Sequence, residues 1–401
     1  MRTRRLIALL ILFFALSSHV SHGRSSIVEI GLLSKTKSKT IIITPLSGAY
    51  SLKYKDSVVY MLSNQDLLHV SVKNGELELK TLNGLLGHFP SIHLVPQGRE
   101  GSFKLKPVIP YGHTRAYDDA LSISVLEDRL KVVSEVNIDK YVAGVVKSEV
   151  GTNEGIELYK VQAIICRTYA LSNFRKHEDE DFQLCDKVHC QVYYGRCDQA
   201  DPLTGLSYIA SGEILKAAIL TTGLVLIDTT LELITASFHS NCGGQTVNSE
   251  DVWMLPKMYL KSIVDPYCVE RRNARWKREI ASDKWLGYFK KVYGYPIEDA
   301  GSRERALNFT QTSRAPYFQN NEQIMLKDVR TDWRLKSAFF STSVEGSTVL
   351  IQGRGYGHGV GLCQEGSMEM AERGKSYKDI LNFYYTNVAL IDIASLRFLL
   401  K

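Results

Sequence analysis

The sequence predicts an α+β fold, in which a β-rich N-terminal region precedes a mixed α/β core. Two observations support this prediction. Between residues 27 and 136, short apolar runs alternate with polar residues at a period of two, and KNGE and LEDR are typical turns. From residue 138 the period becomes helical, and strand-like and helix-like segments then alternate. We therefore expect the active site in a cleft of the second region, lined by loops.

The first 23 residues predict an export signal. Three arginines precede an apolar run at 6–16, and small residues follow at Ser21 and Gly23. The run is too short to span a bilayer comfortably, although an uncleaved N-terminal anchor is the alternative. Removal of Arg2, Arg4 and Arg5 with this segment would lower the formal net charge of +6 to +3.

Composition and missing motifs exclude several classes of function. Hydrophobic residues make up 44% and charged residues 23%, which is ordinary for a globular protein. Basic residues are dispersed, without a stripe interleaved with aromatic residues, so we expect no nucleic-acid partner. Neither a GxxxxGK[ST] loop nor a GxGxxG between strand and helix occurs, so we expect no nucleotide site. HExxH and GxSxG motifs are also missing.

The segment NIDKYVAGVVKSEV predicts the first helix. Its apolar residues and Glu149 fall at the spacing of one helical face, and Gly151 is a typical C-terminal stop. We expect Asn153 to cap a second helix, at about 155–174. That helix is apolar nearly all round, as buried helices are.

Glu149 is the candidate acid. A carboxylate on the buried side of the last helical turn has its pKa raised by desolvation and by the negative helix C-terminus. A glutamate tuned in this way suits general-acid work near neutral pH. The alternative is an exposed glutamate in a frayed last turn.

Further elements follow along the chain. We expect a helix at about 212–222, strands at 224–230 and 231–240, and a polar insert at 266–321 that contains an amphipathic helix at 285–294. Two strands, at 337–343 and 347–353, then lead into a glycine-rich loop. A last helix at 362–373 should end at Gly374.

The glycine-rich loop at 353–366 contains six glycines in fourteen residues. Glycine permits positive φ and a close approach of the backbone to a ligand. We expect a tight loop that presents Arg354, Tyr356 and His358. The alternative is a hairpin bend in which His358 is a satisfied core residue.

Seven cysteines, an odd number, leave at least one thiol unpaired or used as a metal ligand. Cys185, His189 and Cys190 lie within six residues, and His177 precedes them by eight. Thiolate and imidazole at this spacing suit tetrahedral zinc. A disulfide between Cys185 and Cys190 is the alternative in an exported protein. His239 and Cys242 form another His–Cys pair beside a Gly-Gly turn.

Three ordered stretches resemble the SpoIID/LytB family. They are NIDKYVAGVVKSEV with YKVQAIICRTYAL, SFHSNCGGQTVNSEDVW, and GRGYGHGVGLCQEGSMEMAERG followed by ILNFYY. The resemblance covers about 118–392 and implies a catalytic domain at 118–401, with 266–321 as a family-variable insert, after a β-rich region at 24–117. One departure is Cys363, where the family usually has serine.

The resemblance implies an exported lytic transglycosylase, in the periplasm or on the outer face of the cytoplasmic membrane. Its substrate would be the bond between N-acetylmuramic acid and N-acetylglucosamine in denuded peptidoglycan strands, and its products would have 1,6-anhydro ends. Glu149 matches the family's catalytic glutamate. The resemblance also favours zinc at Cys185, His189 and Cys190, with His177 as the fourth ligand.

Other residues are assigned to the substrate or to the scaffold. We expect Arg167 to brace the site from the second helix. The expected substrate-binding residues are Gln162, His239, Ser240, Arg354, Tyr356, His358 and Gln364. Two rival functions remain: a non-catalytic peptidoglycan-binding partner of a cell-wall amidase, and a hydrolase with zinc as its catalyst.

Overall fold

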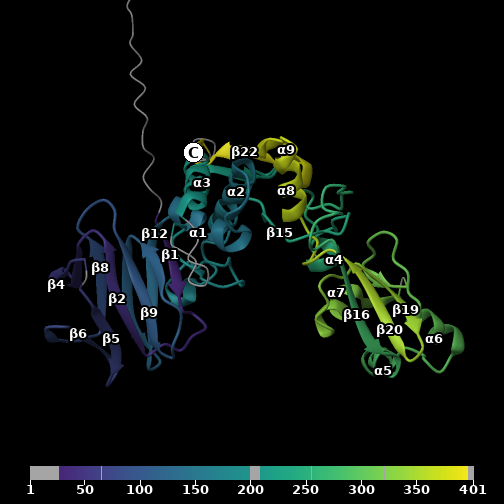
Figure 1. Cartoon of the computed structure of the whole chain (residues 1–401), viewed down its shortest axis with the longest axis horizontal. Helices are drawn as coiled ribbons and strands as arrows, with labels where there is room; N and C mark the ends of the chain where they lie inside the picture. The colour runs from purple at the N-terminus through teal and green to yellow at the C-terminus, as the bar shows by residue number, and fades with distance from the viewer. Residues whose placement is uncertain (1–26, 65, 199–207, 254, 320, 396–401) are drawn as a thin grey trace, which may run out of the picture.

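The computed structural model describes residues 27–64, 66–198, 208–253, 255–319 and 321–395. The predicted export signal at 1–23 lies outside the described residues. The helices in the described part are too short or too polar to cross a membrane. The α+β prediction is confirmed: two β-sheets open the chain, helices follow, and a small α/β lobe lies beyond the helices, from which the chain returns to the helical layer (Figure 1).

The N-terminal region is a β-sandwich. The first sheet has the order β13 (Leu184–Cys185), β1 (Ile27–Leu32), β12 (Arg129–Asn137), β11 (Ala120–Leu126), β8 (Ser91–Pro96), β3 (Tyr50–Tyr54) and β4 (Ser57–Leu62). The second has the order β10 (Arg115–Asp118), β9 (Ser102–Ile109), β2 (Thr40–Ser47), β5 (Leu68–Lys73), β6 (Glu76–Thr81) and β7 (Gly84–Phe89). Tyr50 and Phe103 meet across the two sheets, with ring centroids 5.9 Å apart.

The sandwich extends past the division at residue 117 that the family resemblance implied, and it matches the strand-like pattern at 27–136. The division expected after residue 117 falls within β10, and β11 and β12 lie between β1 and β8 of the first sheet. The β-rich region therefore reaches Asn137. The expected turns are present: Asn74, Glu127 and Asp128 adopt positive φ between paired strands.

The helical layer begins directly at the end of β12. The predicted first helix is confirmed as α1 (Ile138–Val150), whose N-terminal N–H groups donate to the Asn137 side chain and which ends at Gly151 with a φ of 89°. The second, α2 (Ile156–Ser172), begins after Gly155, so the expected cap at Asn153 is wrong. The N-cap of α2 is Gly155, two residues after the expected position.

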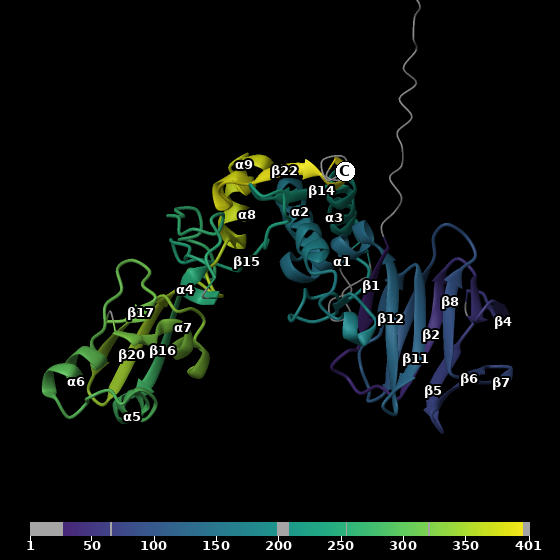
Figure 2. The same cartoon turned by 180° about the vertical axis from the view of Figure 1, so that it is seen from behind.

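Helix α2 is the centre of this layer. It packs against α1, α3 (Tyr208–Leu220), α8 (Gln364–Glu372) and α9 (Tyr377–Tyr384), which accounts for its apolar surface on every side. Figure 2 shows these helices between the sandwich and the second lobe. Strand β14 (Leu224–Ile227) pairs with β22 (Ala389–Asp392) at the edge of the layer.

Two predicted elements differ in extent. Within 231–240, where we expected a full strand, the strand is limited to β15 (Phe238–His239). It pairs in parallel with β21 (Leu362–Cys363), so the last predicted helix starts at Gln364 rather than at residue 362. A short helix, α4 (Glu250–Trp253), follows β15.

The insert expected at 266–321 is only part of a larger lobe, which has its own core and extends to Arg354. Strands β16 (Arg275–Ala281), β20 (Thr348–Arg354) and β19 (Phe340–Glu345) form its sheet. Three helices and two short strands lie around this sheet: α5 (Ser282–Tyr293), α6 (Ala300–Leu307), β17 (Tyr317–Phe318), β18 (Asn321–Met325) and α7 (Leu326–Asp332). Helix α5 confirms the predicted amphipathic helix, since Trp285, Leu286 and Phe289 are buried. The expected strands at 337–343 and 347–353 correspond to β19 and β20.

Candidate functional site

Glu149 lies in the last turn of α1 and is half-buried. Its Oε1 accepts a hydrogen bond from the backbone N–H of Val192 at 3.0 Å. Burial raises the pKa of Glu149 above its ordinary value, and the Val192 hydrogen bond offsets only part of the rise. A raised pKa suits a carboxyl group to general-acid catalysis, because its protonated form persists to higher pH.

The loop that carries Val192 is fastened along α1. The Tyr141 hydroxyl donates to Gln191 at 3.4 Å, and the Tyr194 N–H donates to the Ser148 hydroxyl at 3.2 Å. A Cβ added at Gly144 would lie 2.3 Å from the Gly195 carbonyl oxygen, so only glycine allows this approach. The position of Val192 beside Glu149 is therefore fixed by contacts on both sides of it.

The same loop brings the four predicted metal ligands together. The ligand atoms of His177, Cys185, His189 and Cys190 all lie within 4.8 Å of one another. His177 Nε2 is 3.3 Å from His189 Nδ1 and 3.4 Å from Cys190 Sγ, and Cys185 Sγ is 3.9 Å from His189 Nδ1. Ligand atoms of tetrahedral zinc with this S₂N₂ set are about 3.3–3.8 Å apart.

A carboxylate orients this cluster from outside. His177, which precedes the short 3-10 helix η1 (Glu178–Glu180), directs Nε2 at the cluster and donates from Nδ1 to Glu180 at 2.6 Å. Such a partner fixes the tautomer and the ring orientation of a metal-binding histidine. Cys185 and Cys190 are free thiols, so the arrangement fits a metal ion better than the alternative disulfide.

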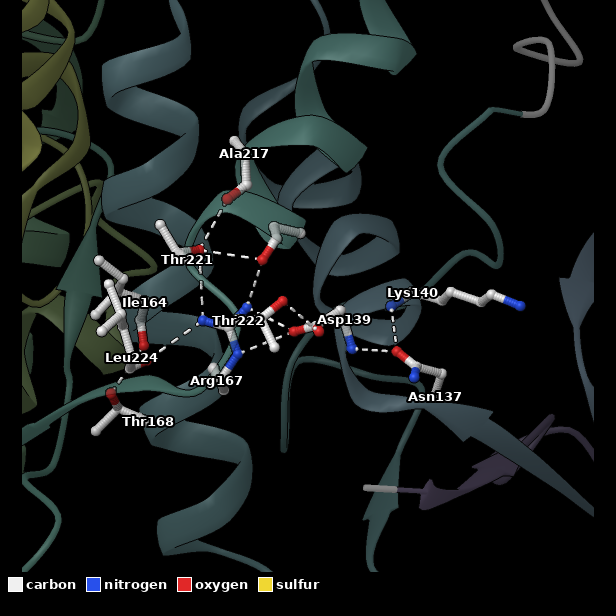
Figure 3. Close-up of polar contacts among 11 residues, drawn as sticks. Asn137, Asp139, Lys140, Ile164, Arg167, Thr168, Ala217, Thr221, Thr222 and Leu224 are labelled. Carbon is white, nitrogen blue, oxygen red and sulfur yellow. Dashed lines mark hydrogen bonds and ion pairs between the residues drawn. The ribbon is translucent and has the colours of Figure 1, made fainter. Parts of the chain in front are cut away.

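Arg167 of α2 connects this helix to α1 and α3. Its guanidinium is almost fully buried and lies 2.8 Å from the Asp139 carboxylate of α1. The same group donates to the Ala218 carbonyl at the end of α3, at 2.9 Å, and to the Leu224 carbonyl at 3.3 Å (Figure 3). Thr222 also donates to Asp139, at 2.8 Å. Arg167 thus holds α1, α2 and α3 together, in keeping with the expected bracing role.

The glycine-rich loop packs against the segment 238–244. Backbone N–H groups of Asn241 and Tyr356 donate to each other's carbonyls at 3.0 and 2.7 Å. Gly355 has a φ of 78°, and a Cβ there would lie 2.6 Å from the Asn241 carbonyl oxygen. The loop is therefore tight, and its glycines are needed because two backbones meet.

Two histidines face each other where these segments meet. The rings of His239 and His358 have centroids 5.5 Å apart, and Trp253 of α4 lies at the same distance from His358. His358 Nδ1 accepts from the Val360 N–H at 3.0 Å, and His239 Nδ1 donates to the Val360 carbonyl at 3.1 Å. In the described part of the chain the buried Nε2 of His239 has no partner.

Both histidines are neutral at neutral pH. Burial, with the nearby Arg330 charge, lowers the pKa of His358 to about 4. Burial, with His358 and Arg314, lowers the pKa of His239 well below its ordinary value. Because Nδ1 of His239 carries the proton, its Nε2 offers a bare acceptor to a ligand hydroxyl or amide.

Tyr356 and Arg354 differ in what they offer to a ligand. Tyr356 is 45% exposed, and the Lys336 ammonium lies over its ring, 5.8 Å from the ring centroid. The Arg354 guanidinium already donates to the carbonyls of Gln311 and Thr312, at 2.8 and 2.9 Å, and stacks on Phe339. Arg354 therefore supports the fold, although it also lines a cavity of about 460 Å³ beside the turn at 243–244.

The remaining predicted binding residues lie deeper. Ser240 is half-buried and accepts from the Asn273 side chain at 3.3 Å. Gln162 of α2 is fully buried and Gln364 nearly so, and among the described residues neither amide nitrogen has a partner. Their role in substrate binding stays a prediction.

The structure thus gathers the predicted residues into two groups. One group is Glu149 with the loop that holds the four metal-binding residues. The other is His239, Ser240, Tyr356 and His358. Helix α2 packs against both α1 and α8 and so links them. Within the described part, the hydrogen bond of the Glu149 carboxylate goes to Val192 and not to the glycine-rich loop.

Two residues of this site were missed in the sequence. Glu365 is buried and accepts from the side chains of Asn241 and Asn273, at 2.6 and 2.5 Å. Arg314, from the insert, donates to the Cys242 carbonyl at 2.7 Å and underlies Gly359, whose Cβ would lie 2.8 Å from it. Glu365 lies at the end of the glycine-rich stretch 353–366 and could have been noticed there. Nothing near Arg314 in the sequence marks it.

Comparison with known proteins agrees with this architecture. Residues 126–227 match the family model described as SpoIID, stage II sporulation protein. An uncharacterized protein of Brachyspira hyodysenteriae is 26% identical over 385 residues, covering 94% of this chain and 96% of that protein. Stage II sporulation protein D of Bacillus subtilis is 27% identical over 66% of this chain and 77% of its own length. The amidase enhancer of Bacillus subtilis is 24% identical over 62% of this chain and 40% of its own length. The chain is therefore similar to the SpoIID family, most directly over residues 126–227.

Proposed function

We propose that this chain is an exported peptidoglycan lytic transglycosylase with Glu149 as its single catalytic acid and base. The observation that carries the proposal is the half-buried Glu149 carboxyl, with its raised pKa and its hydrogen bond from Val192. Its relatives named for stage II sporulation and for amidase enhancement support a role at the cell wall. We place the protein in the periplasm or on the outer face of the cytoplasmic membrane.

The reaction needs one acid and no water. Protonated Glu149 gives its proton to the oxygen that joins C1 of N-acetylmuramic acid to N-acetylglucosamine. The C1–O bond breaks, its electron pair stays on the leaving oxygen, and positive charge develops at C1. The 6-hydroxyl of the same sugar then bonds to C1 and returns a proton to the Glu149 carboxylate. The product carries a 1,6-anhydro end, and the acid is restored.

The glycine-rich loop would bind the strand. The exposed ring of Tyr356 can stack on a sugar, and His239 Nε2 can accept from a sugar hydroxyl or an N-acetyl N–H. Both histidines are uncharged at neutral pH, so we assign them to positioning rather than to acid catalysis.

The four residues His177, Cys185, His189 and Cys190 fit a structural zinc ion. When bound, zinc would supply cross-linking of the loop rather than reaction chemistry, because the cluster holds four protein ligands. Val192 follows Cys190 by two residues, so a fixed cluster keeps the Val192 N–H aimed at Glu149.

Mass spectrometry of the products from purified glycan strands, with and without stem peptides, tests the proposal. We expect anhydro-ended fragments from the wild type and from Glu154→Gln, and at most traces of them from Glu149→Gln over the same reaction time. Glu154 is a matched control because it is another half-buried glutamate with a raised pKa, close to Glu149 in sequence.

Other outcomes select the rival functions. Reducing-end products would show a hydrolase, and loss of those products on chelation without a change in melting temperature would assign catalysis to zinc. Strand binding without any product, together with stimulation of an added amidase, would favour the amidase-partner function. The 24% identity to an amidase enhancer is the observation behind that alternative.

A further inference from the structure

A second cluster of potential ligands lies away from the first. It consists of Cys242, Asp265, Cys268 and Cys363, all fully buried. Cys242 follows β15, Asp265 and Cys268 lead into the insert, and Cys363 ends β21 and caps α8. We expected Cys242 to be paired with His239, but its neighbours are instead these three residues from distant parts of the chain.

The spacing of the four ligand atoms fits one metal ion. All lie within 4.8 Å of one another, as in the first cluster. Cys242 Sγ is 3.3 Å from Cys268 Sγ and 3.1 Å from Asp265 Oδ2. A tetrahedral ion with metal–sulfur distances of about 2.3 Å and metal–oxygen distances of about 2.0–2.2 Å needs ligand atoms about 3.3–3.8 Å apart. The Cys242–Cys268 distance already lies in this range, and the Cys242–Asp265 distance is 0.2 Å below it.

The ligands are oriented by surrounding donors. The Tyr384 hydroxyl and the Tyr267 N–H each donate to one oxygen of Asp265, both at 2.9 Å. Cys363 Sγ accepts from the N–H groups of Cys242 and Gly366, at 3.3 and 3.4 Å. Hydrogen bonds of this kind position carboxylate and thiolate ligands around an ion.

The cluster also lacks a positive charge at its centre. In the described part of the chain, the Asp265 carboxylate contacts Cys242, Tyr267 and Tyr384, none of which is cationic. Arg314 stands outside the cluster, with its guanidinium on the Cys242 carbonyl. A buried carboxylate is costly unless it is paired or bound to a metal. A disulfide between Cys242 and Cys268 would leave both Asp265 and the Cys363 thiol unused.

We propose that Cys242, Asp265, Cys268 and Cys363 form a second metal site, for a thiophilic divalent cation such as Zn²⁺. Three thiolates and one carboxylate are a ligand set that favours such ions over Mg²⁺ or Ca²⁺. The site goes beyond the proposed cleavage reaction, because it joins three chain segments whatever the protein does. It ties the segment that carries His239 to the end of the glycine-rich loop.

Metal content of the full chain tests this proposal. The protein is purified under reducing conditions, given excess Zn²⁺ and desalted, and zinc per chain is measured. We expect two equivalents in the wild type and one in Cys268→Ser. Cys185→Ser should also retain one, and the double variant none. Cys166→Ser, which removes a fully buried thiol outside both clusters, should retain two.

X-ray absorption of the wild type decides the matter if Cys268→Ser fails to fold. Filling of both sites gives an average of about 2.5 sulfur ligands per zinc, because one site has two thiolates and the other three, whereas the first site alone gives about two. One zinc with two sulfurs overturns the proposal. So does a peptide map of the untreated protein in which Cys242 and Cys268 are disulfide-linked, or equal zinc content in Cys268→Ser and the wild type.

Discussion

The two groups of site residues are built in opposite ways. The helical half, residues 138–195, is one continuous stretch in which Glu149, Val192 and the first cysteine–histidine cluster lie close in sequence. The glycine-loop half joins 238–244 to 353–364, more than a hundred residues away, through parallel strands β15 and β21. The family model covers the helical half and stops at residue 227, before the glycine-loop half begins.

Their electrostatics are also opposite. Burial raises the pKa of Glu149 in the helical half and lowers the pKa of His239 and His358 in the glycine-loop half. In each case the neutral form is favoured, because desolvation penalises charge of either sign. The difference teaches that the same burial favours a protonated carboxyl group in one half and uncharged histidines in the other.

The largest expected effect on activity comes from a substitution in the helical half. Glu149→Gln should lower kcat for strand cleavage by about 10²–10⁴-fold, the range for a lost general acid, and change KM little. Steady-state kinetics on defined glycan oligomers measure this, with Glu154→Gln as the control. A loss confined to KM would place Glu149 in binding and remove the proposed division of labour.

The second prediction concerns the support of that half. Arg167→Ala should lower the free energy of unfolding by about 3–5 kcal/mol, because it leaves Asp139 and two carbonyls without their buried partner. Arg373→Ala removes an exposed pair with Glu369 and should cost less than about 1 kcal/mol. Urea unfolding compares the two variants. Equal costs would mean that Arg167 does not join α1, α2 and α3 as described.

A smaller effect is expected on the glycine-loop side. Tyr356→Ala should raise KM about tenfold, or about 1.4 kcal/mol, with kcat nearly unchanged, since the exposed ring can stack on a sugar and the proposed acid is Glu149. Tyr356→Phe keeps the ring and should behave as the wild type. If kcat falls in Tyr356→Ala as much as in Glu149→Gln, the two halves do not have separate roles.

The smallest effect is the pH dependence of stability, which should have opposite signs in the two halves. A raised carboxyl pKa costs stability as pH rises above about 4.5 through the folded value, so Glu149→Gln should raise Tm more at pH 7 than at pH 4. A lowered histidine pKa costs stability as pH falls from 6.5 toward about 4, so His358→Gln should flatten the acid side of the Tm profile. Parallel profiles for wild type and both variants would contradict these assignments.

Much of the helical half could be predicted from the sequence. The period of NIDKYVAGVVKSEV placed Glu149 in the last turn of a helix, and the geometry agrees, because helical periodicity is a local property. The short sequence spacing of Cys185, His189 and Cys190 likewise limits the distance between their side chains in any fold. His177, eight residues before Cys185, lies close enough in sequence to reach them. The cap at Asn153 was mispredicted because the ends of helices depend on a few residues of backbone path.

The sequence by itself therefore determined the α+β class, the helical half with Glu149 in the last turn of α1, and the tightness of the glycine-rich loop. Only the tertiary structure decided that β11 and β12 belong to the sandwich, that Arg314 and Glu365 support the loop, and that Cys242, Asp265, Cys268 and Cys363 meet. The physical reason is the range of the interactions. Periodicity and short spacings act within a few residues, whereas these contacts form only when segments far apart in the chain pack together.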